Sequence, residues 1–583
     1  MLRRWLDALA KSVWVKRVTG SLRDIELWII LGSIVGLLSG LAGVALTLAI
    51  EHISPMLIGG AHGALVNTGL DPGLLWVIPL VALGGLASGL ITSFLAPEAE
   101  GHGTDYVIES IHRRKAELRA RVAVWKIIAS SILISTGGSA GKEGPIAQSG
   151  ASIGSTIAMI MRLTKVERRL LVLAGVAGGI SSVFKAPLGA VIFALEVPYK
   201  RDIEAEAVTP IAVSSFTGYL VSTQILGGST LFNAPTITPE GVYRHLWIFL
   251  AIGLFTGLLA RLFVRTFYWV ADRVSMLRLH RALKPALGGL GAGLIAFLVP
   301  GVLGQSYWVV GEILGGTVYP WGLLLALTLA KVLATSLSVG SGGSGGVFGP
   351  SIVIGASGSA ALAMLLTGDP SLVPMASLVG MMAFLAAAGK VPLAAIVMAV
   401  EMSRGYSMIA PAIAAVAVST LASGGDSIYR SQVDTRVDSP FYLGLELRQI
   451  LRKVRVRQVM TTNVITVKPS QTLLDVLRLI GKTGHRGFPV VDEEGRVVGM
   501  ITERDIARYD RTKLDKVRVE EAMTRHLVVA TPDETLDDAM TKIIRYTVGR
   551  LPVVEDLDTM RLVGIVTPRD ILRAYKALEA TIE

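Results

Sequence analysis

The amino-acid sequence contains one glycine-rich motif twice, at positions separated by 205 residues. Gly-Gly-Ser-Ala-Gly begins at Gly137 and Gly-Gly-Ser-Gly-Gly begins at Gly342, and each copy continues into Gly-x-x-Gly-Pro. A second motif, Lys-x-Pro-Leu followed by a glutamate, starts at Lys185 and recurs at Lys390 with the same separation. Two motifs that share one separation indicate a duplicated unit. In a membrane protein such a duplication predicts two halves that meet at a midplane site built from broken helices.

The composition places most of the chain in a lipid bilayer. Of its 583 residues 51% are hydrophobic and only 17% are charged, with a mean hydropathy of +0.57, which is too apolar for a soluble protein of this length. The net charge of +11 lies largely beside apolar segments, which is typical of the positive-inside rule and requires no nucleic-acid partner. We expect a multi-pass protein of a bacterial or archaeal inner (plasma) membrane, with both termini cytoplasmic. The absence of cysteine excludes disulfides, thiolate metal sites and cysteine nucleophiles.

Apolar and charged stretches alternate in a way that divides the chain into five parts. We predict an all-α polytopic membrane domain with inverted halves and broken, re-entrant helices, followed by a pair of small α/β modules. The expected bounds are 1–26 for a cytoplasmic N-terminal segment, 27–430 for the membrane domain with halves at about 27–225 and 246–430, 431–455 for a linker, and 456–510 and 517–576 for the modules.

Each glycine motif interrupts an apolar stretch, at 137–145 and at 340–350. Irregular backbone at membrane depth is tolerated only where it is buried in protein or lines a wet cavity. Pro145 and Pro350 fit the first turn of a new helix, where a missing N–H costs nothing. A helix N-terminus carries unpaired N–H groups and about half a positive charge, and glycine lets an ion approach the backbone closely. We therefore expect two helix N-termini to converge on one anion, held weakly enough to leave again.

Glu143 is the only acidic residue between Glu117 and Glu167. A carboxylate at membrane depth is costly and marks a functional site by default. At the mouth of the predicted anion site its negative charge could occupy the place of the ion, and protonation or anion competition would move it aside. The alternative interpretation is an acid that only complements the dipole of its helix.

Several of these residues resemble a known family. The stretch 141–145, Gly-Lys-Glu-Gly-Pro, looks like the Gly-Lys/Arg-Glu-Gly-Pro signature of the CLC chloride channel and transporter family. The stretch 346–350 resembles that family's Gly-x-Phe-x-Pro motif, and the tail resembles the paired CBS domains that many members carry. The resemblance covers nearly the whole chain. It implies a homodimer with one pore per subunit and two antiparallel halves in each.

The resemblance also implies roles for individual residues. Glu143 becomes the gating glutamate, and the backbone amides of Val347 and Phe348 would bind the central anion. The full anion-binding set implied in this way is His102, Gly141, Gly144, Gly346, Val347, Phe348 and Tyr429. Tyr429 matches the pore tyrosine by its position just past the final span, with Tyr442 as the alternative.

The sequence departs from the family pattern in its first anion motif. That motif often reads Gly-Ser-Gly-Ile-Pro, whereas the matching stretch 101–105 here is Gly-His-Gly-Thr-Asp. His102 either donates an N–H to chloride, which would add pH sensitivity, or turns away while the neighbouring backbone binds the ion. The order of preference among chloride, nitrate and bromide therefore stays open.

A second departure concerns proton coupling. Proton-coupled members usually carry an inward-facing glutamate directly after the position of Glu196, and here that position is Val197, as in channel-type members. Some transporters of the family work without this glutamate. We expect Glu196 and its repeat counterpart Glu401 to be structural, capping or pairing within the helix packing.

The charged tail contains its own repeat. Met-Thr at Met460 recurs 63 residues later at Met523, and a Thr-x-x-Asp motif occurs twice. The CBS resemblance implies an adenine-nucleotide site (ATP, ADP or AMP) in the cleft between the modules. The residues concerned are Thr502, Asp505, Thr567 and Asp570. The alternative is a dimerisation platform without a ligand that couples the tail to the pore, and no cofactor is required for either.

These patterns favour passive, gated chloride permeation over enzymatic activity. The nearest rival is a chloride/proton antiporter, which would share the fold, the pore and the gate. A CBS-bearing cation transporter would need clustered intramembrane carboxylates, but acidic residues are sparse here. A membrane metalloprotease would need His-Glu-x-x-His, and none of the eight histidines lies in such a motif.

Overall fold

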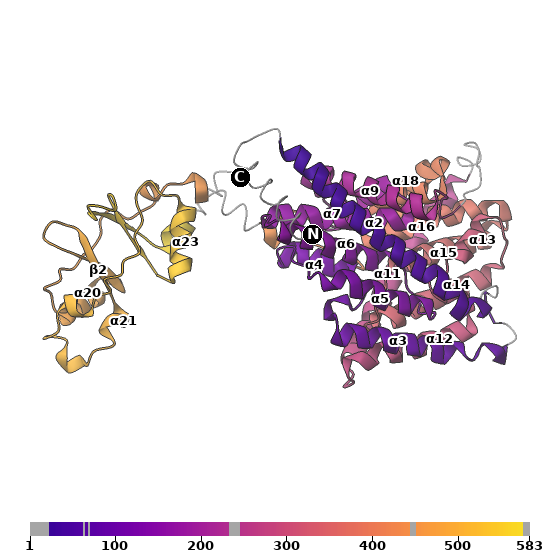
Figure 1. Cartoon of the computed structure of the whole chain (residues 1–583), viewed down its shortest axis with the longest axis horizontal. Helices are drawn as coiled ribbons and strands as arrows, with labels where there is room; N and C mark the ends of the chain where they lie inside the picture. The colour runs from indigo at the N-terminus through magenta and orange to yellow at the C-terminus, as the bar shows by residue number, and fades with distance from the viewer. Residues whose placement is uncertain (1–22, 62–64, 68–69, 233–244, 443–450, 575–583) are drawn as a thin grey trace, which may run out of the picture. The chain divides into compact units, whose positions relative to one another are not determined.

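The computed structural model describes residues 23–61, 65–67, 70–232, 245–442 and 451–574. The chain forms two compact units that divide between Phe441 and Tyr442 (Figure 1). Unit 1 is helical, and unit 2 combines helices with two small sheets. The fold class predicted from the sequence is therefore confirmed. Most of the predicted N-terminal segment and part of the predicted linker, 443–450, lie outside the described residues.

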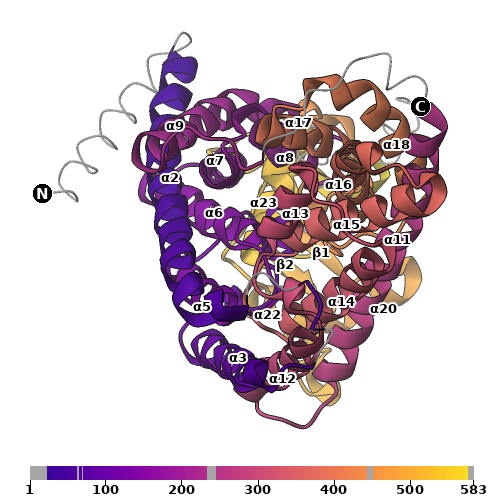
Figure 2. The same ribbon diagram turned by 90° about the vertical axis from the view of Figure 1, so that its right-hand side faces the viewer.

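The helices of unit 1 follow the duplication. Those of the first half are α2 (Arg23–Ile58), α3 (Val77–Phe94), α4 (Thr104–Arg113), α5 (Arg121–Ser135), α6 (Glu143–Ile160), α7 (Lys165–Phe184), α8 (Pro187–Glu196) and α9 (Val208–Leu226). Those of the second half are α11 (Leu246–Ser275), α12 (Lys284–Leu298), α13 (Tyr307–Leu314), α14 (Trp321–Gly340), α15 (Phe348–Thr367), α16 (Val373–Gly389), α17 (Pro392–Ser403) and α18 (Ile409–Ala422). Figure 2 shows the two halves side by side, with α3 packed on α12 and α8 packed on α17.

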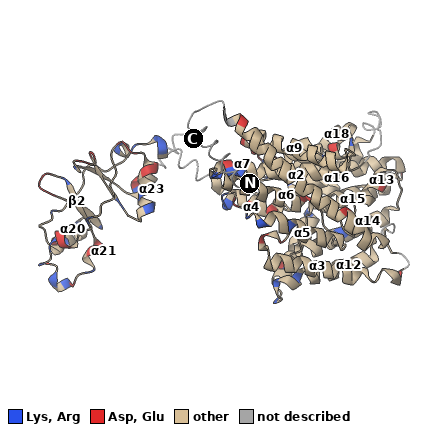
Figure 3. Cartoon of the chain, in the orientation of Figure 1, with Lys and Arg blue, Asp and Glu red and all other residues tan. Residues whose placement is uncertain are grey.

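Much of unit 1 is long and apolar enough to span a bilayer. Within the described residues, seven helical segments meet that criterion by length and composition. Lys, Arg, Asp and Glu are sparse along these helices (Figure 3). Shorter apolar helices, α8 and α17 among them, pass only part of the way through a layer about 30 Å thick. A membrane domain with broken helices follows from these lengths.

Both predicted helix breaks are confirmed. α5 ends at Ser135 and α6 begins at Glu143, while α14 ends at Gly340 and α15 begins at Phe348. Gly137 and Gly342 open the two breaks with φ of +96° and +104°, a region that side chains other than glycine rarely adopt. Each glycine loop therefore turns the chain and starts a new helix inside the protein.

The two halves are joined by hydrogen bonds that obey the repeat. The Gly141 N–H donates to the Gly346 carbonyl (2.8 Å) and the Gly346 N–H donates to the Gly141 carbonyl (2.7 Å). Equivalent side chains also exchange partners across the halves, because Ser130 bonds to Ser344 and Ser139 bonds to Thr335, each at 2.9 Å. The glycine loops thus lie against each other on the pseudo-symmetry axis.

Glu196 and Glu401 cap each other's helices. The Glu196 carboxylate accepts from the N–H groups of Leu393 (3.2 Å) and Ala394 (2.9 Å) at the start of α17. The Glu401 carboxylate accepts from the N–H groups of Leu188 (3.2 Å) and Gly189 (2.7 Å) at the start of α8. A carboxylate at a helix N-terminus satisfies unpaired donors and complements the dipole. The structural role expected for both glutamates is confirmed.

We expect Glu401→Ala to lower the stability of unit 1 by about 1–2 kcal/mol, because two helix-end N–H groups lose their acceptor. Thermal unfolding in detergent measures the change. Asp369→Ala is the control, since the Asp369 carboxylate caps an exposed turn by accepting from the Ser371 N–H. If Glu401→Ala is as stable as Asp369→Ala or more stable, the capping role of Glu401 is contradicted.

The stretch 431–441 differs from the prediction, which placed it in a linker. The Ser431 N–H donates to the Asp105 carboxylate (2.7 Å), and the Gln432 amide donates to the carbonyls of Val197 (2.9 Å) and Gly389 (3.0 Å). These bonds satisfy carbonyls at the ends of membrane helices, so this polar segment packs into unit 1. The linker interpretation is corrected for these residues.

Unit 2 consists of two similar modules. The first contains α20 (Leu473–Thr483), β1 (Gly487–Val491), β2 (Val497–Thr502) and α21 (Glu503–Ile506), and the second contains α22 (Val519–Ala522), α23 (Leu536–Tyr546), β3 (Leu551–Val554) and β4 (Leu562–Val566). β1 pairs antiparallel with β2, and β3 pairs antiparallel with β4. The two apolar clusters exchange segments, because Val519 of α22 is buried with the residues of the first module and Val456 is buried with those of the second.

Unit 2 should lose helix stability in acid. Hydrogen bonds from Thr472 lower the pKa of Asp475, and hydrogen bonds from Thr535 lower the pKa of Asp538. A folded pKa below the unfolded value of about 3.9 stabilises the fold above that pH, and the contribution disappears as pH falls through the folded pKa. Hydrogen exchange on the full chain, corrected for intrinsic rates, should show protection of α20 and α23 falling below about pH 4. Thr472→Ala and Thr535→Ala should weaken that pH dependence, and an unchanged dependence would contradict it.

Candidate anion site

The site begins where the glycine loops deliver α6 and α15 to one place. Each helix starts directly after the bridge between Gly141 and Gly346. The first N–H groups of a helix have no partner within that helix, so each start is a favourable place for negative charge. Two such starts, one from each half, lie next to each other in the buried part of unit 1.

The Glu143 carboxylate occupies this place. Its side chain is buried, with 1% of its surface exposed. One oxygen, Oε2, accepts from the Gly349 N–H at 3.1 Å in the first turn of α15, and the other, Oε1, accepts from the Tyr307 hydroxyl. The acid at the start of one half's helix therefore bonds to the helix start of the other half. A carboxylate that served only its own helix dipole would not need this contact.

The glycines around the Glu143 carboxylate are required because there is no space for a Cβ atom at their positions. A Cβ on Gly349 would lie 2.7 Å from the Tyr307 hydroxyl oxygen and 3.1 Å from Glu143 Oε2. A Cβ on Gly346 would lie 2.8 Å from the Gly144 nitrogen. Cβ atoms on Gly141 and Gly144 would collide with the Glu143 carboxylate and the His102 carbonyl, respectively. The glycines keep the backbone close enough for its N–H groups to face a small anion.

Val347 and Phe348 turn their side chains into the core. The Phe348 ring lies 5.0 Å from the Phe184 ring and 5.7 Å from the Phe193 ring, and both Val347 and Phe348 are buried. Packing of this kind fixes the backbone at the start of α15. What these two residues can offer an anion is therefore their main chain, which is the role that the family resemblance implies for them.

His102 lies in the loop before α4 and faces Tyr429. The two ring centroids are 5.7 Å apart, and the His102 ring also lies 5.9 Å from the Phe267 ring. His102 is buried, and its Nδ1 has no hydrogen-bond partner among the described residues. Tyr429 is 2% exposed and belongs to unit 1, whereas Tyr442 begins unit 2. The two residues predicted to touch an anion on this side are thus brought together.

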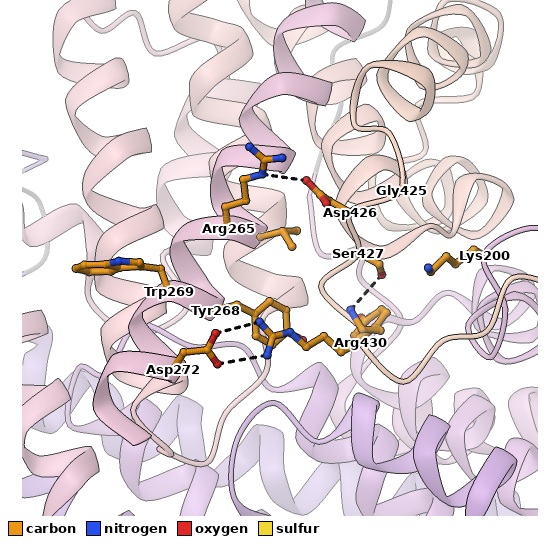
Figure 4. Close-up of a pocket in the computed structure, with 11 residues that line it drawn as sticks. Lys200, Arg265, Tyr268, Trp269, Asp272, Gly425, Asp426, Ser427 and Arg430 are labelled. Carbon is orange, nitrogen blue, oxygen red and sulfur yellow. Dashed lines mark hydrogen bonds and ion pairs between the residues drawn. The ribbon is translucent and has the colours of Figure 1, made fainter. Parts of the chain in front are cut away.

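A cavity of about 500 Å³ has Tyr429 in its lining. Figure 4 shows the charged side chains around this cavity. Its basic side chains are paired with acids, because Arg430 bonds to Asp272 at 3.3 Å and Arg265 bonds to Asp426 at 3.2 Å. The Arg430 guanidinium also lies 3.5 Å over the Tyr268 ring, which holds it in place. The lining of the cavity thus combines the buried Tyr429 with charged side chains that are held in ion pairs.

Two buried lysines, which the sequence analysis did not identify, hold the loops before α4 and α13. Lys126 Nζ donates to the carbonyls of Ala99 (2.8 Å) and Gly101 (2.7 Å). Lys331 Nζ donates to the carbonyls of Val302 (2.9 Å) and Gly304 (2.8 Å) and to a serine hydroxyl. Both lysines are fully buried and are separated by the same 205 residues as the glycine motifs. A search for charged residues at that separation would have found them.

Val197 follows α8 and contributes no ionisable group. Its side chain is buried, and its carbonyl accepts from the Gln432 amide at 2.9 Å. The position where the resemblance places an inner proton-carrying glutamate is thus occupied by an apolar side chain in packed surroundings.

In unit 2 both Thr-x-x-Asp motifs form hydrogen-bonded helix starts. The Asp505 carboxylate accepts from the N–H (2.9 Å) and the hydroxyl (2.6 Å) of Thr502. Asp570 accepts from Thr567 in the same way, at 2.9 and 2.7 Å. The same carboxylate oxygen takes both bonds in each motif, so these aspartates cap their helices.

Comparison with known proteins places this site in a family. The family model described as voltage gated chloride channel matches residues 84–424, and the CBS domain model matches 456–511 and 519–577. A putative chloride channel protein, ClcB-like, of Ralstonia nicotianae is 30% identical over 415 residues, covering 68% of this chain and 95% of the relative. The H(+)/Cl(-) exchange transporter ClcA of Cronobacter sakazakii is 28% identical over 422 residues, covering 69% and 88%. A slow cyanobacterial Cl-/H+ antiporter of known structure superposes with a TM-score of 0.59 at 23% identity, covering 70% and 97%.

The chain therefore belongs to the CLC family of chloride channels and transporters, as its sequence motifs indicate. Anion transport across a membrane is the activity that this family shares. The relatives include proteins named as channels and proteins named as exchangers, so membership alone does not separate the two modes of transport.

Proposed function

We propose that this protein is a chloride-selective channel gated by Glu143. The observation that carries the proposal is the bond from the Gly349 N–H to the Glu143 carboxylate at 3.1 Å. That N–H belongs to the helix start where an anion would bind, so the carboxylate competes with chloride for one place. Protonation of Glu143 removes the charge of the carboxylate and weakens its hydrogen bond to the Gly349 N–H. The anion then displaces the carboxyl group and binds at the helix start.

The anion meets mostly backbone along its way. The main chain of Gly144, Val347 and Phe348 supplies N–H groups without a full positive charge, which favours entry and still permits exit. The N–H groups of Gly141 and Gly346, which the resemblance includes in the anion-binding set, are bonded to each other's carbonyls and position the loops instead. His102 and Tyr429 complete the path on the other side of the gate. His102 Nδ1 lacks a protein partner among the described residues, which suits a ring that donates to a passing anion.

Passive conduction is supported by Val197, because no proton-carrying side chain stands at that position. Antiport is the second candidate, favoured by relatives named as H(+)/Cl(-) exchange transporters and by a gate that itself titrates. A channel and an antiporter differ in whether a chloride gradient drives the movement of protons. In proteoliposomes with an outward chloride gradient, a channel moves no protons against their gradient. Proton uptake driven by chloride would overturn the channel and establish the antiporter, with Glu143→Gln vesicles as the control for leak.

The remaining proposals concern assembly and regulation. Membership of the family supports a homodimer with one pore per subunit, in a bacterial or archaeal inner membrane with both termini cytoplasmic. The CBS pair supports an adenine-nucleotide site, although Asp505 and Asp570 each commit one oxygen to capping. Chloride flux recorded with and without ATP inside the vesicles tests it. An Asp505→Asn variant that abolishes an ATP effect would support the site, and equal flux with and without ATP would favour the platform.

A further inference from the structure

We propose that Tyr307 is the latch of the gate and, once the gate leaves, a ligand of the permeating anion. This inference rests on the proposed role of Glu143. The Tyr307 hydroxyl donates to Glu143 Oε1 in the closed arrangement. A phenol has one O–H, so the same proton can face either the carboxylate or an anion that replaces it. Tyr307 thereby stabilises negative charge at this position whichever species carries it.

The position of Tyr307 follows from the duplication. Gly101 and Gly304 occupy equivalent places in the loops before α4 and α13, each with positive φ (+72° and +58°), and each has its carbonyl bonded to a buried lysine. α13 starts at Tyr307 as α4 starts at Thr104. The loop before α4 carries the anion-contacting candidate His102, so the loop before α13 is its counterpart on the Glu143 side. In this register Tyr307 corresponds to Thr104 and His102 corresponds to Gln305, so the duplication supplies equivalent backbone at the two ends of the anion path, and each loop adds a side-chain donor of its own.

The surroundings hold the Tyr307 hydroxyl where it is needed. The ring packs edge-on against Phe232, with centroids 5.7 Å apart. The Phe232 N–H donates to the Met402 carbonyl at 2.9 Å, which fixes the supporting ring. On the other side Gly349 offers no Cβ, and one placed there would lie 2.7 Å from the hydroxyl oxygen. The hydroxyl therefore has a rigid backing and an open front toward the helix start of α15.

The charged and titratable groups around Glu143 are few. Lys142 precedes Glu143 in the chain. Lys331 on α14 and Tyr429 also interact electrostatically with the Glu143 carboxylate. Lys142 lies 3.9 Å from the Glu51 carboxylate, and Lys331 donates to backbone carbonyls and a serine. Both lysines are thus engaged elsewhere. The direct side-chain bond to the Glu143 carboxylate comes from Tyr307.

The test is the substitution Tyr307→Phe, made in two backgrounds and measured as chloride efflux from proteoliposomes. With Glu143 present, loss of the hydroxyl weakens the hold on the charged carboxylate. The pH of half-maximal flux should then move upward by about one unit, since a hydrogen bond to a charged group is lost. With Glu143→Ala, the hydroxyl faces the anion instead. There the same substitution should raise the half-saturating chloride concentration about fivefold.

Tyr307→Phe should make opening easier when Glu143 is present and should weaken anion binding when Glu143 is replaced by alanine. These opposite effects separate a residue that holds the gate from one with only a structural role. Tyr319→Phe is the matched control, because the Tyr319 hydroxyl also bonds to a carboxylate, that of exposed Glu312 on the same stretch; it should change neither quantity. Equal thermal midpoints would show that the variants fold. If Tyr307→Phe reduces flux in both backgrounds, or fails to move either quantity, the inference is overturned. If Glu143→Ala itself keeps the wild-type pH dependence, the gate proposal fails instead.

Discussion

Replacing Glu143 by glutamine should raise chloride flux at pH 7.5 about tenfold or more and remove most of its pH dependence. In the proposed gate the carboxylate competes with the anion through its charge-assisted hydrogen bond to the Gly349 N–H, which is worth about 1.5–3 kcal/mol. Since about 1.4 kcal/mol corresponds to a factor of ten, a neutral side chain should release the site to that degree. Efflux from proteoliposomes at pH 5 and pH 7.5 measures the effect.

The control for this substitution is Glu312→Gln. Glu312 also accepts from a tyrosine, but it is exposed and bonds to Tyr319, so its loss of charge should leave flux unchanged. If Glu143→Gln conducts like the wild type at both pH values, the carboxylate is not a gate. The alternative, that Glu143 only complements the dipole of its helix, would then be correct.

The largest expected loss of stability follows from Arg169→Met. Arg169 on α7 donates to Glu204 and to the Tyr199 hydroxyl, and both members of the ion pair are 1% exposed. The Arg169 guanidinium also lies 4.8 Å over the ring of Phe441, in the last segment of unit 1. Removing one partner of a buried pair leaves an uncompensated charge and costs about 3–5 kcal/mol. Thermal unfolding in detergent should show a clear fall of the midpoint.

Arg114→Met provides the comparison. Arg114 pairs with Glu109 at 2.9 Å, but the two side chains are 48% and 30% exposed, and an ion pair at the surface contributes about 0–1 kcal/mol. A midpoint for the Arg169 variant equal to that of the Arg114 variant would show that the Arg169 network does not stabilise unit 1.

The helix breaks and the buried carboxylate at the start of α6 could be predicted because their signals are local. Glycine readily adopts the positive φ that ends a helix, and proline fits the first turn of the next helix. The glycine motifs that start at Gly137 and Gly342, each followed by a proline, therefore predict a helix end and a new helix start. A single acid in an uncharged stretch likewise marks Glu143 without any knowledge of its neighbours. Family motifs then supplied a role for residues such as Val347, whose apolar side chain carries no chemical signal of its own.

Tyr307 could not be predicted in the same way. Its partner Glu143 is 164 residues away in the sequence, and a tyrosine beside Trp308 reads as an ordinary core or interface residue. Its loop is also two residues out of step with the main repeat, because Gly304 follows Gly101 by 203 positions. The packing of segment 431–441 was missed for a related reason, since its polar side chains bond to carbonyls that only the folded helices bring within reach.

The paired bonds between Gly141 and Gly346 also limit how this gene can change. A Cβ on Gly141 would lie 2.9 Å from the Gly349 nitrogen, and a Cβ on Gly346 would lie 2.8 Å from the Gly144 nitrogen, so each loop leaves the other no room for a side chain at these positions. The two copies differ at the next positions along the chain, where the Glu143 carboxylate bonds to the helix start of the opposite half and the Phe348 ring packs into the core. The two halves therefore differ chemically directly beside a pair of glycines that occupies the same place in both copies.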